Sequence, residues 1–182
     1  MNLTLGDTEE IIEYAYDYGC LPNQLAYILA TAYHESWATM KPIRETRATN
    51  DKEVIRILDE AYANGDLSWV SSPYWRKDKA GKAWYGRGYV QLTFKYNYIK
   101  AGRNLNIDLT TDPDKALETT IAKKTLVEGM MEGWFTGRAL PAYVSHSRSD
   151  YFNARKVVNG LNKATSIKNH AVKYQRLLGK EC

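Results

Sequence analysis

The sequence has few of the residues that build a disulfide framework or a metal centre. Its 182 residues include two cysteines, Cys20 and Cys182, neither in a CxxC pattern, and three scattered histidines. Two isolated thiols favour free cysteines over a disulfide framework. The lack of an HExxH pattern or a Cys/His cluster argues against a zinc site, so we expect neither a metal nor a cofactor.

Long apolar segments are also missing. No run approaches the roughly 18 residues that cross a bilayer. The first ten residues have neither the basic start nor the apolar stretch of a secretory signal peptide. We therefore expect a protein that is made in the cytoplasm and stays there unless something else releases it.

The chain contains no low-complexity tract, linker or repeat with a period of 20 to 50 residues. With 44% hydrophobic and 25% charged residues, its composition is typical of a globular protein and not of a disordered one. We predict a single domain that spans residues 1–182.

What the chain does have is an excess of Tyr and Trp, with 14 Tyr and 5 Trp against 3 Phe. These rings suit a contact-making groove, including one for sugars, as well as an ordinary core and rim. The net charge of +4 is compatible with an anionic polymer but does not choose among nucleic acid, cell-wall glycan and lipid. A non-catalytic polymer-binding module therefore stays open as one function class, although the basic residues are not clustered.

Helical patterns cover most of the chain, and cap signals divide it into segments. The predicted helices begin after Asp7 and at Pro22, Asn50, Thr93, Asp112 and Lys163. A further, shorter helix is predicted to end before Asn159. Residues 67–93 differ, because Trp and Tyr alternate there with glycines. The segment 78–81 is a plausible turn between two short strands. The predicted fold class is α+β and mostly helical, with a small β-hairpin lobe or a long ordered loop in the middle.

Two carboxylates are candidates for acid–base chemistry. Glu35 ends a strongly apolar helix among aromatic residues, where burial and the helix dipole both disfavour the charged form. Glu45 follows ten residues later in a polar setting that keeps a carboxylate ionised. Glycoside hydrolysis needs one neutral and one charged acid. A frayed helix end at Glu35, and a surface ion-pair cluster of Glu45 with its arginine neighbours, would explain the same residues without chemistry.

A glycine-containing motif, Tyr-Gly-Arg-Gly-Tyr-Val-Gln-Leu-Thr, occupies residues 85–93. It lacks the third glycine and the Gly-Lys-Ser/Thr ending of phosphate-binding loops. Instead, the motif and the residues after it supply amides, hydroxyls and aromatic rings, which are the groups that bind sugars. These residues are Gln91, Thr93, Tyr96, Asn97 and Tyr98.

Taken together, these segments resemble glycoside hydrolase family 19. The resemblance rests on the His34–Glu35 pair at a helix end, the Gly-Arg-Gly-x-x-Gln-Leu-Thr motif and the Tyr96-Asn-Tyr98 segment, and it runs from about residue 20 to 178. Residues 26–36 and 40–45 are more similar to the family's bacteriophage endolysin branch. The resemblance implies a lysozyme-like fold with the β-hairpin lobe beside a cleft, and a single catalytic domain without a separate cell-wall-binding module.

The family resemblance also implies roles for individual residues. Glu35 matches the general acid, Glu45 the base that activates water, and Thr93 the hydroxyl that helps hold that water. The family inverts the anomeric centre, which requires carboxyl groups roughly 6.5–9.5 Å apart. We assign substrate binding to His34, Tyr85, Arg87, Gln91, Tyr96, Asn97 and Asn159.

The chain departs from the family's plant chitinases in its short interval between the two acids and its unpaired cysteines. The short interval leaves Asp51 and Glu53 as other candidates for the base, and it argues against crystalline chitin as the substrate. Tyr89 replaces a family proline and is expected to add a wall to the cleft. Seven aromatic residues are expected to form that sugar-binding wall: Trp69, Tyr74, Trp75, Trp84, Tyr85, Tyr89 and Tyr96.

The function predicted from these residues is that of a phage endolysin. It would hydrolyse the β-1,4 bond between N-acetylmuramic acid and N-acetylglucosamine of peptidoglycan as a monomer, with no nucleic-acid partner. It would wait in the host cytoplasm and reach the wall through a separate membrane pore. A chitinase, a lytic transglycosylase that uses Glu35 alone, and a non-catalytic polysaccharide-binding module are the alternatives.

The predicted C-terminal helix, residues 163–180, is rich in Lys and Arg. Such a helix could make transient contact with an anionic membrane. It could equally be the last core-packing helix with a solvated basic face, and this second interpretation is the one we favour.

Overall fold

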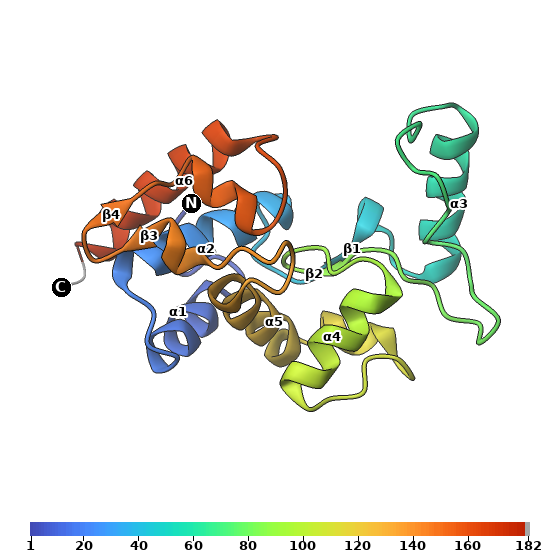
Figure 1. Ribbon diagram of the computed structural model, residues 1–182, viewed down its shortest axis with the longest axis horizontal. Coiled ribbons are helices and arrows are strands. Elements are labelled where there is room, and N and C mark those ends of the chain that lie inside the picture. The colour runs from blue at the N-terminus through green and yellow to red at the C-terminus, as the bar shows by residue number, and fades with distance from the viewer. Residues whose placement is uncertain (181–182) are drawn as a thin grey trace.

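The computed structural model describes residues 1–180, so the predicted free thiol of Cys182 lies outside the described residues. Short strands lie between helices (Figure 1). The α-helices are α1 (Thr8–Asp17), α2 (Pro22–Glu35), α3 (Asp51–Ala63), α4 (Lys95–Leu105), α5 (Thr119–Glu132) and α6 (Ala164–Leu178). The strands are β1 (Ile43–Arg44), β2 (Arg87–Gly88), β3 (Val144–Ser145) and β4 (Arg148–Ser149). The 3₁₀ turns are η1 (Glu45–Arg47), η2 (Pro113–Leu117), η3 (Leu140–Ala142) and η4 (Asn153–Val157).

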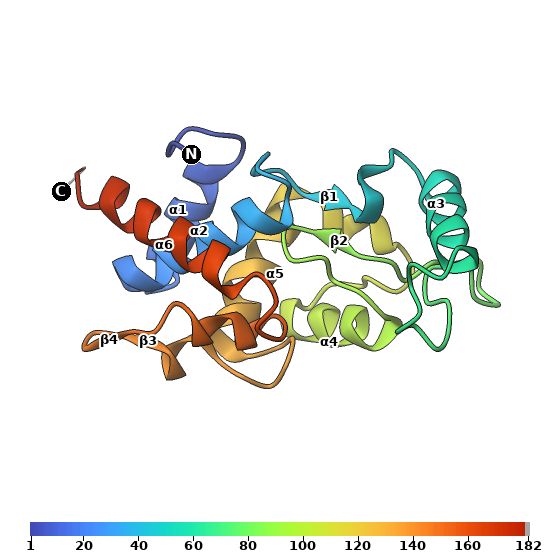
Figure 2. The ribbon, with the colours of Figure 1, turned by 90° about the horizontal axis from the view of Figure 1, so that it is seen from above.

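Helices α1, α2, α5 and α6 form a helical body around one apolar core (Figures 1 and 2). Helix α2 runs through this core, because residues 24–32 are all buried. Helix α6 makes the most extensive helix–helix contact in the molecule, and it makes it with α2. It buries Ile167, Ala171, Tyr174 and Leu178. The expectation that the C-terminal helix packs on the core is therefore confirmed, while its contact with a membrane stays a prediction.

A second lobe holds α3, α4 and the long loop between them, and α3 stands farthest from the body (Figure 1). Two smaller apolar clusters stabilise it. One, around Trp75 and Tyr85, lies under α3, and the other, around Trp84 and Tyr98, lies under α4. The strands β1 and β2 lie between the body and the outer part of this lobe (Figure 2).

The small sheet differs from the predicted local hairpin. Residues 78–81 do form a turn, in which the Gly81 amide donates to the Asp78 carbonyl at 2.8 Å, but its flanks are not strands. The flanks share backbone hydrogen bonds from Asp78 to Lys82 and from Trp84 to Tyr74. Side chains add to them, since the indole of Trp75 donates to Asp59 and that of Trp84 to Asp78. The expected alternative, a long ordered loop, is what forms there.

The pairing of β1 with β2 joins segments that are distant in the sequence. Strands β1 and β2 pair antiparallel, with Ile43 opposite Gly88 and Arg44 opposite Arg87. Strands β3 and β4 form a separate antiparallel pair. The mostly helical architecture with small β elements is confirmed. None of the helices within residues 1–180 combines the length and the apolar character of a membrane span.

Several helix boundaries match the sequence signals. Helix α2 begins at Pro22, and the Asn50 side chain caps α3 by accepting from the Glu53 amide at 3.0 Å. The sequence 7–10, Asp-Thr-Glu-Glu, predicts a capping box with Asp7 as the N-cap. This box does not form, because the Asp7 carboxylate accepts from the Tyr89 hydroxyl at 2.6 Å and makes no cap bond. Gly102 predicts the end of the helix that starts near Thr93, but α4 runs past it and closes at Asn106, which has a left-handed conformation.

The single helix predicted after Asp112 is divided into η2 and α5. Between them, Glu118 has an extended backbone (φ −65°, ψ 127°), which ends the first turn and starts the second helix. The chain direction therefore changes at Glu118, and η2 comes to lie against β2.

Candidate active site

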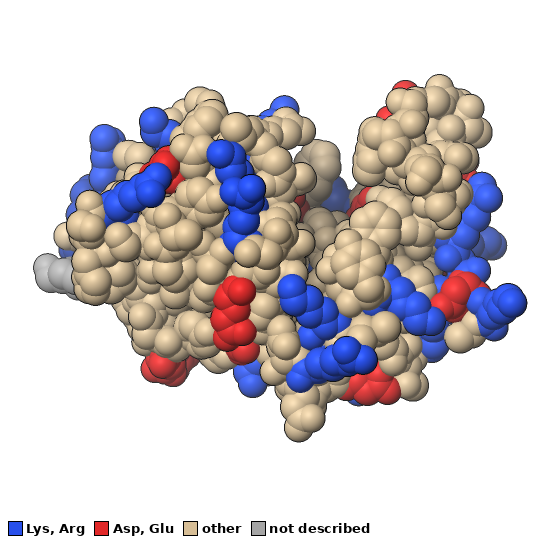
Figure 3. Space-filling model, viewed as in Figure 1, with Lys and Arg blue, Asp and Glu red and all other residues tan. Residues whose placement is uncertain are grey.

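A cleft of about 360 Å³ lies where the helical body meets the second lobe. The surface is hollowed between these two parts in the space-filling view (Figure 3). The end of α2, the loop before β2, residues 90–97 and residues 158–159 contribute to its lining. Six predicted site residues line it together: Glu35, Gln91, Thr93, Tyr96, Asn97 and Asn159.

Glu35 is the last residue of α2 and reaches the cleft from the helical body. Its Oε1 accepts a hydrogen bond from Nη1 of Arg155 at 2.6 Å, and the Arg155 Nε donates to the Asn162 carbonyl at 3.1 Å. Arg155 is buried, so this ion pair is shielded from water. This ion pair fixes the orientation of the Glu35 carboxylate, and no local pattern in the sequence indicates it.

Glu45 begins η1 in the second lobe and is held by neutral donors. The Tyr74 hydroxyl donates to its Oε1 and the Gly86 amide to its Oε2, both at 2.8 Å. Burial, and then the charge and hydrogen bond of Glu45, raise the pKa of Tyr74. The phenol therefore keeps its proton and stays a donor to the Glu45 carboxylate.

The ion-pair cluster considered for Glu45 does not form. Arg44 turns to Asp114, with which it makes an ion pair. Arg47 lies over the ring of Trp37, 5.6 Å from its centroid. The two arginines beside Glu45 in the sequence therefore point to other partners.

Gly86 brings Thr93 and Gln91 close to the amide that holds Glu45. A Cβ atom on Gly86 would lie 2.7 Å from the Gln91 Oε1 and 3.2 Å from the Thr93 Oγ1. The Thr93 hydroxyl donates to the Gln91 carbonyl at 2.7 Å, and the Asn97 side chain donates to the Thr93 carbonyl at the same distance. The glycine of the motif thus allows the polar residues to pack around the base candidate.

Backbone strain is concentrated around this site. Residues other than glycine rarely adopt positive φ, and such residues cluster at functional sites. Most of those in residues 1–180 lie in the segment between α2 and α3 or in the segment before α4. These are Trp37, Ala38, Met40, Thr46, Arg47, Gln91 and Phe94. The two segments carry Glu45 and Thr93, so the chain adopts costly conformations where those two residues are placed.

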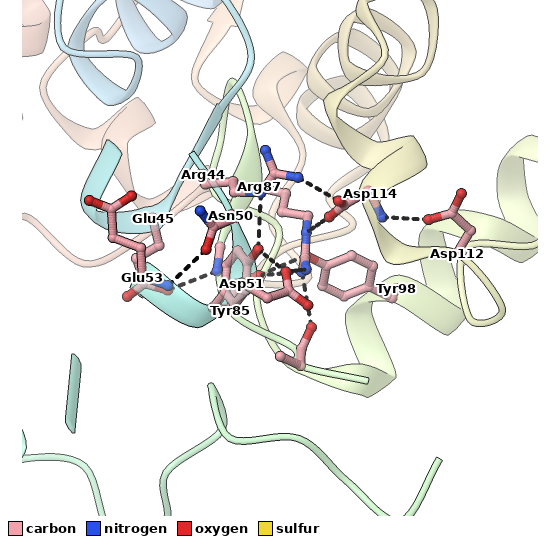
Figure 4. Close-up of polar contacts among 12 residues, drawn as sticks. Arg44, Glu45, Asn50, Asp51, Glu53, Tyr85, Arg87, Tyr98, Asp112 and Asp114 are labelled. Carbon is pink, nitrogen blue, oxygen red and sulfur yellow. Dashed lines mark hydrogen bonds and ion pairs between the residues drawn. The ribbon is translucent and has the colours of Figure 1, made fainter. Parts of the chain in front are cut away.

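Tyr85 and Arg87 do not face the cleft, and their assignment to substrate binding is wrong. Arg87 is buried, with Nε donating to Asp114 at 2.7 Å and Nη2 to Asp51 at 3.1 Å (Figure 4). The guanidinium also lies 3.7 Å from the centroid of the Tyr85 ring, and the Tyr85 hydroxyl donates to Asp51. Both side chains stabilise the second lobe from inside.

The other candidates for the base already have structural partners. Asp51 accepts from Arg87 and Tyr85, as described above. Glu53 accepts from the amide of Thr49 at 3.1 Å and from its hydroxyl at 3.2 Å at the start of α3. Glu45 does not line the cleft itself but accepts from the hydroxyl of Tyr74, which does, so it stays the candidate.

The predicted aromatic wall is only partly correct. Trp69 and Tyr96 are 71% and 64% exposed, and both line the cleft with Tyr74. Phe94, which the sequence argument missed, also lines the cleft and stacks on Tyr96 with ring centroids 5.8 Å apart. Four expected wall residues are buried in the cores instead: Trp75, Trp84, Tyr85 and Tyr89.

His34 lies beside Glu35 in the sequence but is not part of the cleft lining. Its ring packs 6.4 Å from that of His170 on α6. Burial lowers the pKa of both histidines. The structure therefore does not support the assignment of His34 to substrate binding and places it at the α2–α6 interface.

The thiol of Cys20 is buried, and burial raises its pKa to about 12, which makes it a poor nucleophile. Among the described residues, no group of three or more His, Cys, Asp or Glu side chains is arranged to hold a metal ion. Glu35 and Glu45 therefore stay the candidates for acid–base chemistry at this cleft.

Comparison with known proteins identifies the family. The family model for chitinase class I, glycoside hydrolase family 19, matches residues 48–139. Chitinase 2 of Oryza sativa subsp. japonica is 44% identical over 65 residues, which is 35% of this chain and 17% of that protein. The acidic endochitinase of Dioscorea japonica is 32% identical over 80 residues, 43% of this chain and 30% of that protein. The matched stretch thus spans less than a third of either relative.

Solved structures show the same fold over more of the chain. A class IV family 19 chitinase from Zea mays aligns with a TM-score of 0.57 and 21% identity, over 93% of this chain and 78% of that one. Chitinase C from Streptomyces griseus HUT6037 aligns with a TM-score of 0.56 and 22% identity, over 86% and 60%. These alignments confirm the lysozyme-like α+β fold, while the narrower resemblance to phage endolysins stays a prediction. Since the family model covers half of the chain, including the whole glycine motif, the protein belongs to glycoside hydrolase family 19.

Proposed function

We propose that the protein is a chitinase-type hydrolase that cleaves β-1,4 bonds in glycans containing N-acetylglucosamine. One observation carries this proposal: a carboxylate of one lobe lines the cleft, and a carboxylate of the other lobe is hydrogen-bonded to a residue that lines it. Glu35 lines the cleft from the helical body, while Glu45 is held in the second lobe by Tyr74, which lines the cleft. The chitinases named above support the substrate class, and the family model for chitinase class I matches the segment that includes the glycine motif.

In this proposal Glu35 protonates the leaving oxygen. Arg155 occupies its Oε1, and among the described residues Oε2 has no protein partner, so Oε2 is free to carry the proton. A sugar bound in the cleft displaces water from the carboxyl group, and this burial favours the protonated form. Arg155 acts as a positioning residue, since it fixes the orientation of the acid.

Glu45 takes a proton from the attacking water on the opposite face of the sugar. Two neutral donors hold its carboxylate. The Thr93 hydroxyl lies close to Gly86, whose amide holds Glu45, and it can accept a hydrogen bond from the same water. Attack from the face opposite the leaving group inverts the anomeric centre.

The remaining cleft residues suit the binding of neutral sugars. Trp69 and Tyr96 expose aromatic faces on which pyranose rings can stack. Side-chain amides of Gln91, Asn97 and Asn159 line the same cleft and can bind hydroxyl and N-acetyl groups. The cleft thus supplies both kinds of contact that an uncharged N-acetylglucosamine unit offers.

The experiment is hydrolysis of soluble chitin oligosaccharides by the wild type, E35Q and E45Q. General acid–base catalysis contributes about 10²- to 10⁴-fold, so each variant should lose activity by about that factor while keeping its circular-dichroism spectrum. Thr93→Ala should lose less. Full activity of E35Q would overturn the proposal, and a mild effect of E45Q would move the base role to another residue.

Peptidoglycan is the second candidate substrate, and the short connection between the acids favours it. Only residues 36–44 join α2 to η1, and we read this short segment as poorly suited to crystalline chitin. In this version the protein is an endolysin-like muramidase, active as a monomer. It accumulates in the host cytoplasm and needs a separate pore to reach the wall. Mass spectra of digested peptidoglycan distinguish hydrolysis, which leaves reducing ends, from lytic transglycosylation, which leaves 1,6-anhydro ends.

A further inference from the structure

We propose that a basic recess beside the cleft is a subsite for carboxylate groups carried by the glycan. This inference rests on the proposed glycan hydrolysis and specifies its substrate class. The recess has a volume of about 390 Å³ and contains Arg138 and Lys156. It shares Val158 and Asn159 with the cleft, so a glycan bound in the cleft extends directly into it.

The recess and the cleft have opposite charges. Glu35 is the charged side chain among the described residues that line the cleft, whereas the recess is lined by two cations and no acid. Within residues 1–180, neither Arg138 nor Lys156 belongs to an ion pair. The nearby acid Glu132 accepts from Tyr18 and from the Trp134 indole instead. Both cations are therefore available to an anion on a ligand.

Hydrogen bonds fix the backbone that carries the two cations. The Thr136 hydroxyl donates to the carbonyls of Lys156 at 2.6 Å and Val157 at 3.0 Å, which ties the loop after α5 to η4. Gly133 turns that loop at φ +76°, and a Cβ there would lie 2.9 Å from the Arg138 carbonyl carbon. Arg138 uses one donor on the Tyr143 hydroxyl at 3.1 Å and keeps others for a ligand, since a guanidinium has five.

The recess is also connected to the catalytic acid through η4. Arg155, which orients Glu35, and Lys156, which lines the recess, are consecutive residues of that turn. A carboxylate bound by Lys156 would therefore be held by the same turn that positions the acid. From the sequence, only Asn159 of this recess is assigned to substrate binding, and its two basic residues are too far apart along the chain to form a recognisable cluster.

The chemistry of the candidate substrates decides what this recess can bind. Chitin carries only hydroxyl and acetamido groups and offers no negative charge. Peptidoglycan carries carboxylates from two sources: its stem peptides, and the lactyl group of muramic acid where the peptide has been removed. Arg and Lys bind carboxylates through charge-assisted hydrogen bonds. The recess thus fits an acidic glycan and has no role with a neutral one.

The experiment measures binding by calorimetry to E35Q, which keeps the cleft but is expected not to cleave. Three ligands are compared: chitotetraose, a muropeptide tetrasaccharide with stem peptides, and the same tetrasaccharide without peptides. R138Q/K156Q in that background should weaken binding of a carboxylate ligand about tenfold, given up to about 1 kcal/mol for each exposed ion pair. Chitotetraose affinity should not change. The ligand that loses affinity identifies the source of the carboxylate.

K173Q/R176Q is the matched control, because it removes the same charge from the exposed face of α6, away from the cleft. Equal losses in the two double variants, or an equal loss for chitotetraose, would overturn the inference. If R138Q/K156Q fails to fold, E35Q alone still tests it: 0.5 M salt must weaken binding of the carboxylate ligands but not of chitotetraose. If the wild type hydrolyses the glycan but binding shows no preference for carboxylate ligands, the proposed function is retained and the subsite is rejected. If binding shows that preference but the wild type does not hydrolyse the glycan, the subsite is retained and the proposed function is rejected.

Discussion

The two lobes hold their carboxylates in different ways. In the helical body, Glu35 pairs with a buried cation, Arg155, that lies 120 positions away in the sequence. In the second lobe, Glu45 is held by a phenol and a backbone amide, Tyr74 and Gly86, with no cation in contact. The difference suits a division of labour in which a cation orients the acid, while neutral donors orient the base.

The interiors of the two lobes also differ in how apolar contacts and buried charge contribute to them. The body is stabilised by one large apolar cluster around α2. The second lobe has smaller apolar clusters and a buried guanidinium, that of Arg87, paired with Asp51 and Asp114. The second lobe, in which neutral groups hold Glu45, therefore has a buried ion pair in its own interior.

The strongest test of this comparison is Arg87→Met. The substitution removes a buried cation that Asp51 and Asp114 share, and leaves only the Tyr85 hydroxyl on Asp51 and Arg44 on Asp114. We therefore expect a loss of about 3 kcal/mol in the free energy of unfolding. Urea denaturation measures it. Arg56→Met is the control, because Arg56 forms an exposed pair with Glu60 on α3 and should cost well under about 1 kcal/mol. Equal losses would show that the buried pair has no special weight.

Arg155→Met tests the body's side of the site. Without its guanidinium, Glu35 loses the bond that orients it, and we expect kcat to fall about a hundredfold with a much smaller change in KM. Arg155→Lys should recover part of kcat, since a cation returns without the fork geometry. A rise in KM at constant kcat would instead assign Arg155 to substrate binding.

Tyr74→Phe tests the second lobe's side and should have a smaller effect. The substitution removes one of two donors to Glu45 but leaves the Gly86 amide, so activity should fall about tenfold, as expected for one hydrogen bond to a charged group. The ring that lines the cleft is kept. Steady-state kinetics with the same oligosaccharides give the value, and a loss as large as that of Arg155→Met would contradict the comparison.

The smallest expected effect is a dependence of stability on pH that comes from the helical body. Burial lowers the pKa of His34 and His170 below the usual value of about 6.5. The unfolded chain then binds more protons, so stability is complete above about pH 6.5 and declines as the pH falls below that value. Thermal melts between pH 7.5 and 5 should show a decline that is weaker in H34Q/H170Q. An unchanged slope would place the titrating groups elsewhere.

The sequence predicted the elements with clear local signals. Helix α3 begins after the Asn50 cap, and α2 begins at Pro22, because these residues act on their own neighbours. The motif also predicted Gln91 and Thr93 in the cleft, since Gly86 allows the close approach that gathers them. Glu35 and Glu45 remain candidates whose roles the kinetics must test.

What the sequence could not predict is which buried partner each polar residue finds. Arg87 and Arg155 look alike in the sequence, yet one stabilises the second lobe and the other contacts Glu35. Tyr85 and Tyr89 are buried while Tyr96 is exposed, although all three lie in one aromatic stretch. These outcomes depend on pairing between distant segments, which local periodicity does not report.

The buried guanidinium of Arg87 also sets an order for assembly during synthesis. Its two carboxylate partners lie on either side of it in the chain, so the ribosome delivers Asp51 first, then Arg87, and Asp114 last. Until η2 has been made, a buried cation would have only one of its two counter-charges. We expect the second lobe to close only after this point, and a chain truncated before residue 114 to lack a stable second lobe even though α3 is complete.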